Sequence, residues 1–379
     1  MTAIEEISFY SAVLLIIFST GLKKTYFSLR TPLTLPFFLF LLWSLFTLPF
    51  ALNISNSIHD IYAHLIKYYI FFFIVFNFFT QKKDLVRISW TFSIFSALFC
   101  AGGILYFYFF MDRPITERFF LVRDAFIPYL GYLLELAVFF CALIIYNSRD
   151  RSVRIFFSLC FFIISAAIIL TQSRSALLVV VTGSVIIFFR YKKLYFLLLV
   201  FILIPFTPLK ERLTNVQSIV NNERISNFHL YAEIVKDHPF TGIGFGMQTH
   251  QKKGFLEHYF SRLAPEQKKY DIIGTPHSLF LDITVRTGLL GLLIFLYIVW
   301  RIAASTLKLT KSSDPFVKEW GLFMIAAFTG FFLQSLFEEA SFGRAAIVFY
   351  LICAILAILL NIKKKSGIEA NALASEPLK

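Results

Sequence analysis

The chain has 379 residues, of which 58% are hydrophobic and 49 are phenylalanine. A soluble domain has no core large enough to cover so much apolar surface, so this composition indicates an integral membrane protein. The formal net charge of +13 is explained by the positive-inside rule for the loops of membrane proteins, and no nucleic-acid partner is expected.

Eleven apolar segments are long enough, or nearly so, to cross a bilayer as helices. The first and the eighth are short, so twelve is the alternative count. The sequence therefore predicts an all-α polytopic membrane protein with about eleven transmembrane helices. These segments lie at 7–22, 32–51, 60–79, 88–111, 127–147, 153–172, 174–190, 194–209, 278–300, 320–338 and 343–362.

One long polar stretch interrupts the apolar segments, and neither an internal repeat nor a linker divides the chain. We therefore expect one integrated membrane domain. Its parts are N-terminal transmembrane helices over 1–209, a large loop containing short helices over 210–276, C-terminal transmembrane helices over 277–362 and a tail over 363–379. The polar residues after Lys365 predict disorder at the end of the tail.

The large loop has local structure of its own. Apolar spacing predicts a helix that ends at Asp237-His238-Pro239, because proline cannot continue a helix. The glycines of HPFTGIGFG (238–246) follow and predict a chain reversal. A GxGxG spacing also occurs in phosphate-binding loops, but no strand precedes it here, so a dinucleotide site is not expected. Residues 255–263 predict a second, amphipathic helix at the membrane surface.

The positions of the cations predict the orientation of the chain. With the helices counted above, the basic clusters all fall on one side, which the positive-inside rule assigns to the cytoplasm. The N-terminus and the loop at 210–276 then face outward, into the periplasm of a Gram-negative cell. These clusters lie at 23–30, 82–87, 149–154, 190–193, 301–318 and 363–365.

Arg174 lies in a short polar motif, SRSAL (173–177), between two apolar segments. Ser173 is suited to cap the following helix, and Ser175 lies beside the arginine. Free backbone N–H groups and the positive end of the helix dipole make such a terminus an anion site when an arginine is present. The alternative is an interfacial arginine that binds lipid phosphates.

Two more basic residues are expected on the same outer side. Arg224 lies on the predicted loop helix, where an ordinary solvated cation is the alternative interpretation. His277 follows Pro276 at the entrance of an apolar helix. A histidine accepts a proton near neutral pH, so His277 is a candidate general base, with helix capping or packing as the alternative.

Several further charged residues are candidates for supporting roles. Arg286 lies inside an apolar segment, as do Lys67 and Glu135, and such charges are usually paired or functional. Arg123 belongs to a cationic outer loop that is suited to a lipid diphosphate or to headgroups. Glu338 ends the tenth segment and is placed to orient a cation. The loop histidines lack the paired spacing of a zinc site, so no metal is expected.

These motifs and their order resemble the O-antigen ligase and Wzy-type polymerase superfamily of bacterial membrane glycosyltransferases. The resemblance runs from about Ser158 to Ile362. It is carried by SRSAL (173–177), by the loop arginine followed by HPFTGIGFG (238–246), and by PHSLFLDITVRTGLLG (276–291). Relatives often have twelve spanning helices, and they often have an acidic residue at the position of Arg286.

The resemblance implies transfer of a glycan from undecaprenyl diphosphate to an acceptor hydroxyl on the periplasmic face of the inner membrane. It maps diphosphate-binding arginines onto Arg174 and Arg224, and an essential histidine onto His277. Because the donor bond is already activated, an inverting displacement needs neither nucleotide nor metal, and no cofactor is expected. The expected partners are the lipid-linked donor, a lipid A–core acceptor and membrane lipids.

Alternatives remain within and outside this class. An O-antigen ligase is favoured over a polymerase, which would use another lipid-linked chain as the acceptor. Branches that attach glycans to protein or act in other polysaccharide pathways are further alternatives. A lipid-linked glycan transporter or flippase would show inverted repeats and midplane polar residues, and the sequence has only scattered charges.

Overall fold

A computed structural model describes most of the chain as helices. The described residues are 27–119, 127–190, 192, 223–246, 248–249, 254–268, 274–338, 340 and 343–374, with residues 7, 9–11, 13–14 and 18 near the N-terminus. No strand occurs among them. This confirms the all-α fold class that the composition and the apolar segments predict.

Seven helices within the described residues are long and apolar enough to cross a membrane. Two shorter apolar helices, Thr34–Phe50 and Arg174–Ile187, coincide with predicted segments. Segment 194–209 and most of segment 7–22 lie outside the described residues, so the total of eleven stays a prediction. The seven helices are Ile54–Phe78, Lys82–Phe110, Leu130–Asn147, Arg151–Leu170, Leu279–Thr310, Pro315–Ser335 and Ala345–Ser366.

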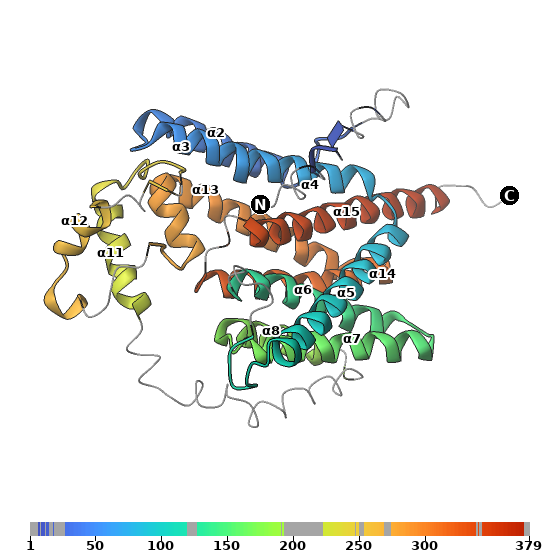
Figure 1. The fold of residues 1–379 in the computed structure, drawn as a ribbon. Helices are drawn as coiled ribbons and strands as arrows, with labels where there is room; N and C mark the ends of the chain where they lie inside the picture. Colours follow the sequence, from blue (N-terminus) through green and yellow to red (C-terminus); the bar gives the residue numbers. More distant parts are fainter. Residues whose placement is uncertain are drawn as a thin grey trace.

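Most helices lie side by side in a bundle, and α11 and α12 lie beyond one end of it, at the left of Figure 1. A π-helical turn over Ile61–Ile66 joins α3 to α4. The α-helices are α2 (Thr34–Phe46), α3 (Ile54–Asp60), α4 (Lys67–Phe78), α5 (Lys82–Ile104), α6 (Ile127–Asn147), α7 (Arg151–Leu170), α8 (Arg174–Arg190), α11 (Glu223–Asp237), α12 (Phe255–Ser261), α13 (Leu279–Thr310), α14 (Pro315–Ser335) and α15 (Gly343–Ala374).

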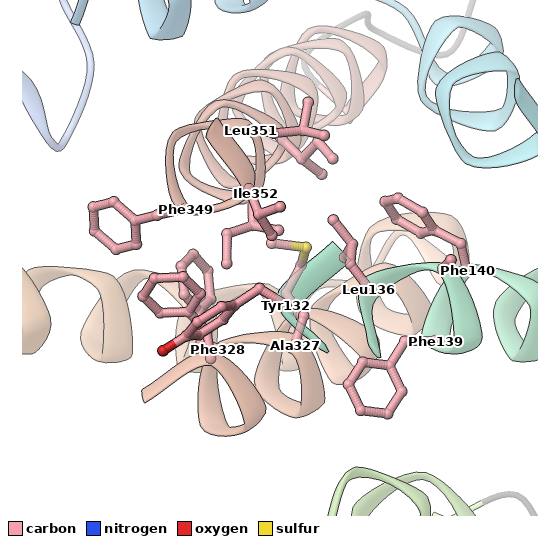
Figure 2. Packing of buried hydrophobic residues seen from close by; sticks show 14 of the residues in the cluster. Tyr132, Leu136, Phe139, Phe140, Ala327, Phe328, Phe349, Leu351 and Ile352 are labelled. Atoms are coloured by element: carbon pink, nitrogen blue, oxygen red, sulfur yellow. The ribbon is translucent and has the colours of Figure 1, made fainter. Parts of the chain in front are cut away.

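The centre of the bundle is formed where α6, α14 and α15 pack together, with aromatic and aliphatic side chains interleaved (Figure 2). Glycines allow α8 to approach the same place. A Cβ at Gly183 would lie 2.1 Å from the ring of Phe139, and one at Gly330 would lie 2.5 Å from Val179. Small residues at such contacts let transmembrane helices pack closely, where dispersion is the main attraction.

Contacts between helix ends define the other end of the bundle, at the right of Figure 1. Lys82 Nζ lies 2.7 Å from Asp314 Oδ2. Lys363 Nζ donates a hydrogen bond to the carbonyl of Lys308 at 2.6 Å. Three of the basic clusters therefore meet on one side of the bundle, as the sequence predicts.

The end of the chain differs from its prediction. Helix α15 continues from Gly343 to Ala374, so residues 366–374 are helical rather than disordered. No proline interrupts this stretch, and its alanine, leucine and glutamate residues favour helix. Ser366 Oγ also donates to Asp314 Oδ2 at 3.2 Å, which holds the extension against the preceding loop.

Lys67 and Glu135, two charged residues predicted to lie within the membrane, have different surroundings. Lys67 is buried, and its ammonium lies 5.2 and 5.7 Å from the ring centroids of Phe9 and Tyr10. Glu135 is buried between α6, α14 and α15, and its Oε1 has no hydrogen-bond partner among the described residues. Lys67 is therefore paired through aromatic rings, whereas the pairing expected for Glu135 is not seen in the described part.

Candidate active site

Arg174 lies where α8 begins, after a tight turn from α7. Gln172 in this turn has a left-handed backbone, with φ of 52°. Ser173 Oγ accepts a hydrogen bond from the backbone N–H of Ala176 at 3.4 Å, so the predicted cap is present. Ser175 Oγ lies 3.1 Å from Ser173 Oγ. The first turn of α8 thus combines a guanidinium, two hydroxyls and the positive helix end, which together suit an anion.

The segment that follows α5 packs against this turn. Arg118 Nε donates to the carbonyl of Thr171 at 3.2 Å, and Gln172 Nε2 donates to the carbonyl of Thr116 at 2.9 Å. Arg113 pairs instead with Glu117 at 3.6 Å. Arg123, the third cation of the predicted outer loop, lies outside the described residues. Of the described cations of this loop, Arg113 pairs within the loop, and Arg118 supports the turn that carries Arg174.

His277 joins Pro276 to α13 and has a left-handed backbone, with φ of 50°. Non-glycine residues rarely adopt this conformation, and such strain is concentrated at functional sites. His277 Nδ1 lies 3.5 Å from Glu338 Oε2, and the two side chains are 13% and 4% exposed. Glu338 therefore lies beside the predicted base, a specific neighbour that the sequence does not indicate.

Contacts along the helices place Arg174 and the His277–Glu338 pair at the same end of the bundle. Tyr132, near the start of α6, has its hydroxyl 3.1 Å from Ser335 Oγ, at the end of α14. Gly330 packs against Val179, so α8 begins beside the part of α14 that precedes Glu338. A helical residue rises about 1.5 Å. Arg174 therefore lies roughly 8 Å before Val179 on α8, and Glu338 lies roughly 12 Å after Gly330 on α14, toward the same end of the bundle.

Arg224 lies in the first turn of α11, which runs from Glu223 to Asp237. Its side chain is outside the described set, so its partners stay a prediction. One turn later, Asn227 Nδ2 donates to the carbonyl of Thr275. Leu230 and Ile234 of the same helix are buried in a cluster with Val285 of α13. The start of α11 therefore lies beside the chain that enters His277.

The glycine cluster forms the predicted turn over 239–243 and then passes along α13. It is here called the glycine strap (Pro239–Gly246). The backbone N–H groups of Ile243 and Gly244 donate to the carbonyls of Val285 and Arg286 at 2.9 and 3.1 Å. These carbonyls can accept from the strap because Gly288, with φ of 71° and ψ of −177°, breaks the helix. The strap amides thus bind the carbonyls of a helix.

The other side of the strap contacts α3 and the residues before it. Leu52 N–H donates to the carbonyl of Ile243 at 2.9 Å, and Gly246 N–H donates to Ser57 Oγ at 3.1 Å. A Cβ at Gly244 would lie 2.4 Å from that of Ala51, and one at Gly242 would lie 2.5 Å from the carbonyl carbon of Arg286. The strap is therefore glycine-rich because two backbones enclose it.

Arg286 is paired with a carboxylate on its own helix. Its Nε lies 2.6 Å from Asp282 Oδ1, and its Nη1 donates to the carbonyl of Phe245 at 2.8 Å. Both side chains are almost completely buried. Sequence reasoning missed Asp282, although its position four residues before Arg286 is a recognisable pairing signal.

A small cavity lies beside Arg286 and is lined mainly by apolar side chains. His64 lines it as well, with Asp60 Oδ1 3.9 Å from its Nε2 and 2.9 Å from Nδ1 of the exposed His59. Sequence reasoning did not single out these three residues. The cavity holds about 40 Å³, whereas a cavity that binds benzene measures roughly 150 Å³. It is therefore too small for a sugar or an isoprene unit.

Asp237 and Arg262 join the two loop helices through an exposed ion pair between the carboxylate and the guanidinium. The hydrogen bond from Arg262 lowers the pKa of the Asp237 carboxyl below its ordinary value. The pair therefore supports the packing of α12 on α11 above the ordinary carboxyl pKa, and this support is lost as the pH falls through the lowered value.

Arg262→Ala is expected to loosen α12 without unfolding the bundle, because the pair is exposed and contributes little to global stability. Amide hydrogen exchange over 254–268 should become faster at neutral pH, while exchange within α14 stays slow. Lowering the pH of the wild type through the lowered pKa of Asp237, which lies below the ordinary carboxyl value, should produce a similar change. Equal exchange in the variant and the wild type at neutral pH would show that this ion pair does not hold α12.

Comparison with known families adds one finding to this geometry. Residues 159–296 match the family model described as O-Antigen ligase. The match contains the α7–α8 turn, α11, the glycine strap and the first part of α13. No match is found among curated proteins. Within the described residues, no group of three or more His, Cys, Asp or Glu side chains is placed to hold a metal ion.

Proposed function

Since residues 159–296 carry a domain of the O-antigen ligase and Wzy-type superfamily, we propose that this protein transfers a glycan from undecaprenyl diphosphate to an acceptor hydroxyl at the periplasmic face of the inner membrane. The observation that supports this most directly is the placement of Arg174 and His277 at one end of the bundle. Both residues lie within the family match, and Glu338, with its carboxylate 3.5 Å from the histidine, comes from outside it.

The proposed chemistry is a single displacement. The acceptor oxygen attacks the anomeric carbon, the bond from that carbon to the diphosphate oxygen breaks, and the configuration inverts. Negative charge grows on the diphosphate as the bond breaks, and the guanidinium groups of Arg174 and Arg224 stabilise it more in the transition state than in the ground state. His277 takes the proton of the acceptor hydroxyl, and Glu338 stabilises the resulting imidazolium.

We favour a ligase that uses lipid A–core as the acceptor. This preference rests on the sequence pattern of the large loop. A polymerase that extends a lipid-linked chain is the second candidate, because the family match covers both activities at the level of the superfamily. Deletion of the gene distinguishes them. Loss of a ligase leaves core lipopolysaccharide without O-chain, whereas loss of a polymerase leaves core bearing a single repeat.

The direct test is reconstitution of the purified protein with a lipid-linked glycan and lipid A–core, without nucleotide. Formation of glycosylated lipid A–core in the presence of a chelator would support the proposed metal-independent transfer. If product forms only after a divalent cation or a nucleoside triphosphate is added, the displacement described above is wrong. If the lipid-linked glycan is converted into longer lipid-linked chains without lipid A–core, the polymerase is the better assignment.

Arg174→Ala and Arg224→Ala are each expected to lower kcat/KM for the donor by about 10²-fold or more, as the loss of one preorganised donor to a developing anion does elsewhere. Arg174→Lys should recover part of this activity, because an ammonium keeps the charge but not the bidentate fork. Arg87→Ala is the matched control, since this exposed arginine lies near the start of α5. Equal losses in all three alanine variants would contradict a specific diphosphate site.

A further inference from the structure

Helix α13 is two helical segments joined at Gly288, and the candidate base directly precedes the first of them. The break lies inside the protein, and every residue from Leu281 to Gly288 is buried. Backbone groups released at a break in a membrane helix must find other partners. The glycine strap supplies them, and it also provides the carbonyl of Pro239 for the N–H of Leu289 at 2.7 Å.

We infer that Arg286 is a positioning residue that holds the first segment of α13, and with it His277, against the glycine strap. This inference rests on the proposed function, because it concerns the placement of the proposed base. In this role Arg286 acts through the position of His277 and not on the substrate. Its guanidinium joins two structures, the strap through the carbonyl of Phe245 and the start of α13 through Asp282.

A continuous set of bonds leads from the strap to His277. Arg286 Nη1 donates to Phe245, and Arg286 Nε donates to Asp282, one turn nearer to the histidine. The backbone N–H of Asp282 donates to the carbonyl of Ser278 at 2.8 Å, and Ser278 directly follows His277. Because Arg286 is 1% exposed, these bonds lie in a low-dielectric interior that strengthens them, which favours a fixed geometry.

The geometry requires an arginine rather than any cation. A guanidinium presents several N–H groups in a rigid plane, so one side chain bonds a carboxylate and a carbonyl in two directions. A plain ion pair would need only opposite charges at 282 and 286. The two possibilities therefore make different predictions for lysine at position 286 and for exchange of the two charges.

Arg286→Met is expected to lower kcat by about 10²-fold, the loss that a misplacement near 1 Å causes, with the donor KM within about twofold of the wild type. Arg286→Lys should recover part of kcat. The exchanged variant Asp282→Arg/Arg286→Asp should not, because an aspartate cannot donate to the carbonyl of Phe245. Arg301→Met is the matched control. Arg301 lies on the second segment of α13 and donates a hydrogen bond to the carbonyl of Pro32 at 3.2 Å.

A structural measurement tests the inference without relying on activity. Hydrogen exchange at the amides of Ile243 and Gly244 should be slow in the wild type, become faster in Arg286→Met and stay slow in Arg301→Met. A wild type without glycan transfer would refute the proposed function while this exchange result could still hold. A normal kcat in Arg286→Met, a raised donor KM at unchanged kcat, or full recovery in the exchanged variant would each overturn the positioning role.

Discussion

Replacing His277 with alanine is expected to lower kcat for glycan transfer by about 10²–10⁴-fold, the usual contribution of a general base. The protein should still insert and fold, because His277 is a loop residue whose left-handed backbone, with φ of 50°, carries some strain in the wild type. The measurement is the turnover of lipid-linked glycan by purified protein in detergent, with thermal unfolding recorded on the same preparation.

Two further variants make the His277 result specific. Glu338→Gln should cause a smaller loss than His277→Ala, because the amide still contacts the imidazole but no longer stabilises its charged form. His258→Ala, which removes an exposed histidine of α12, should leave kcat unchanged. Full activity in His277→Ala would remove the base from the mechanism, and the arginine variants would then still test the diphosphate site independently.

Local signals in the sequence predicted the helical elements well. The proline after Asp237-His238 ends α11 where expected, and Ser173 caps α8 at the predicted position. Both features depend on a few neighbouring residues, because a proline lacks an N–H and a serine hydroxyl bonds the free N–H groups of a first turn. The polytopic all-α class followed in the same way from segment length and composition.

Long-range contacts explain what the sequence could not predict. The glycine strap contains the turn that its glycines predict, whereas its partners, Leu52 and Val285, lie far away in the chain. Nothing near Gly242 or Gly244 indicates that two backbones enclose them. The partnership of His277 with Glu338 likewise depends on how α14 ends beside α13. Such contacts depend on how distant segments pack together, so the spacing of neighbouring residues does not predict them.

Gly288→Ala is expected to be the most destabilising single-methyl change in the described part of the chain. The backbone of Gly288, with φ of 71° and ψ of −177°, lies in a region that only glycine adopts readily, and an alanine there costs about 1–3 kcal/mol in strain alone. A Cβ would also lie 2.0 Å from the carbonyl oxygen of Phe240, so the strap would have to move. Each strap hydrogen bond lost would add about 0.5–1.5 kcal/mol.

Backbone strain and the lost hydrogen bonds together predict that Gly288→Ala lowers the free energy of unfolding by about 3 kcal/mol or more. Few kinds of single substitution destabilise a protein this much. Thermal unfolding in detergent measures it, and the surviving folded fraction should transfer glycan slowly because His277 is displaced. Gly102→Ala is the control, since a Cβ at this helical glycine meets nothing within 4 Å, and alanine favours helix by roughly 0.5–1 kcal/mol. Equal stability of the two variants would show that α13 continues without a break, and the released carbonyls that hold the glycine strap would then not exist.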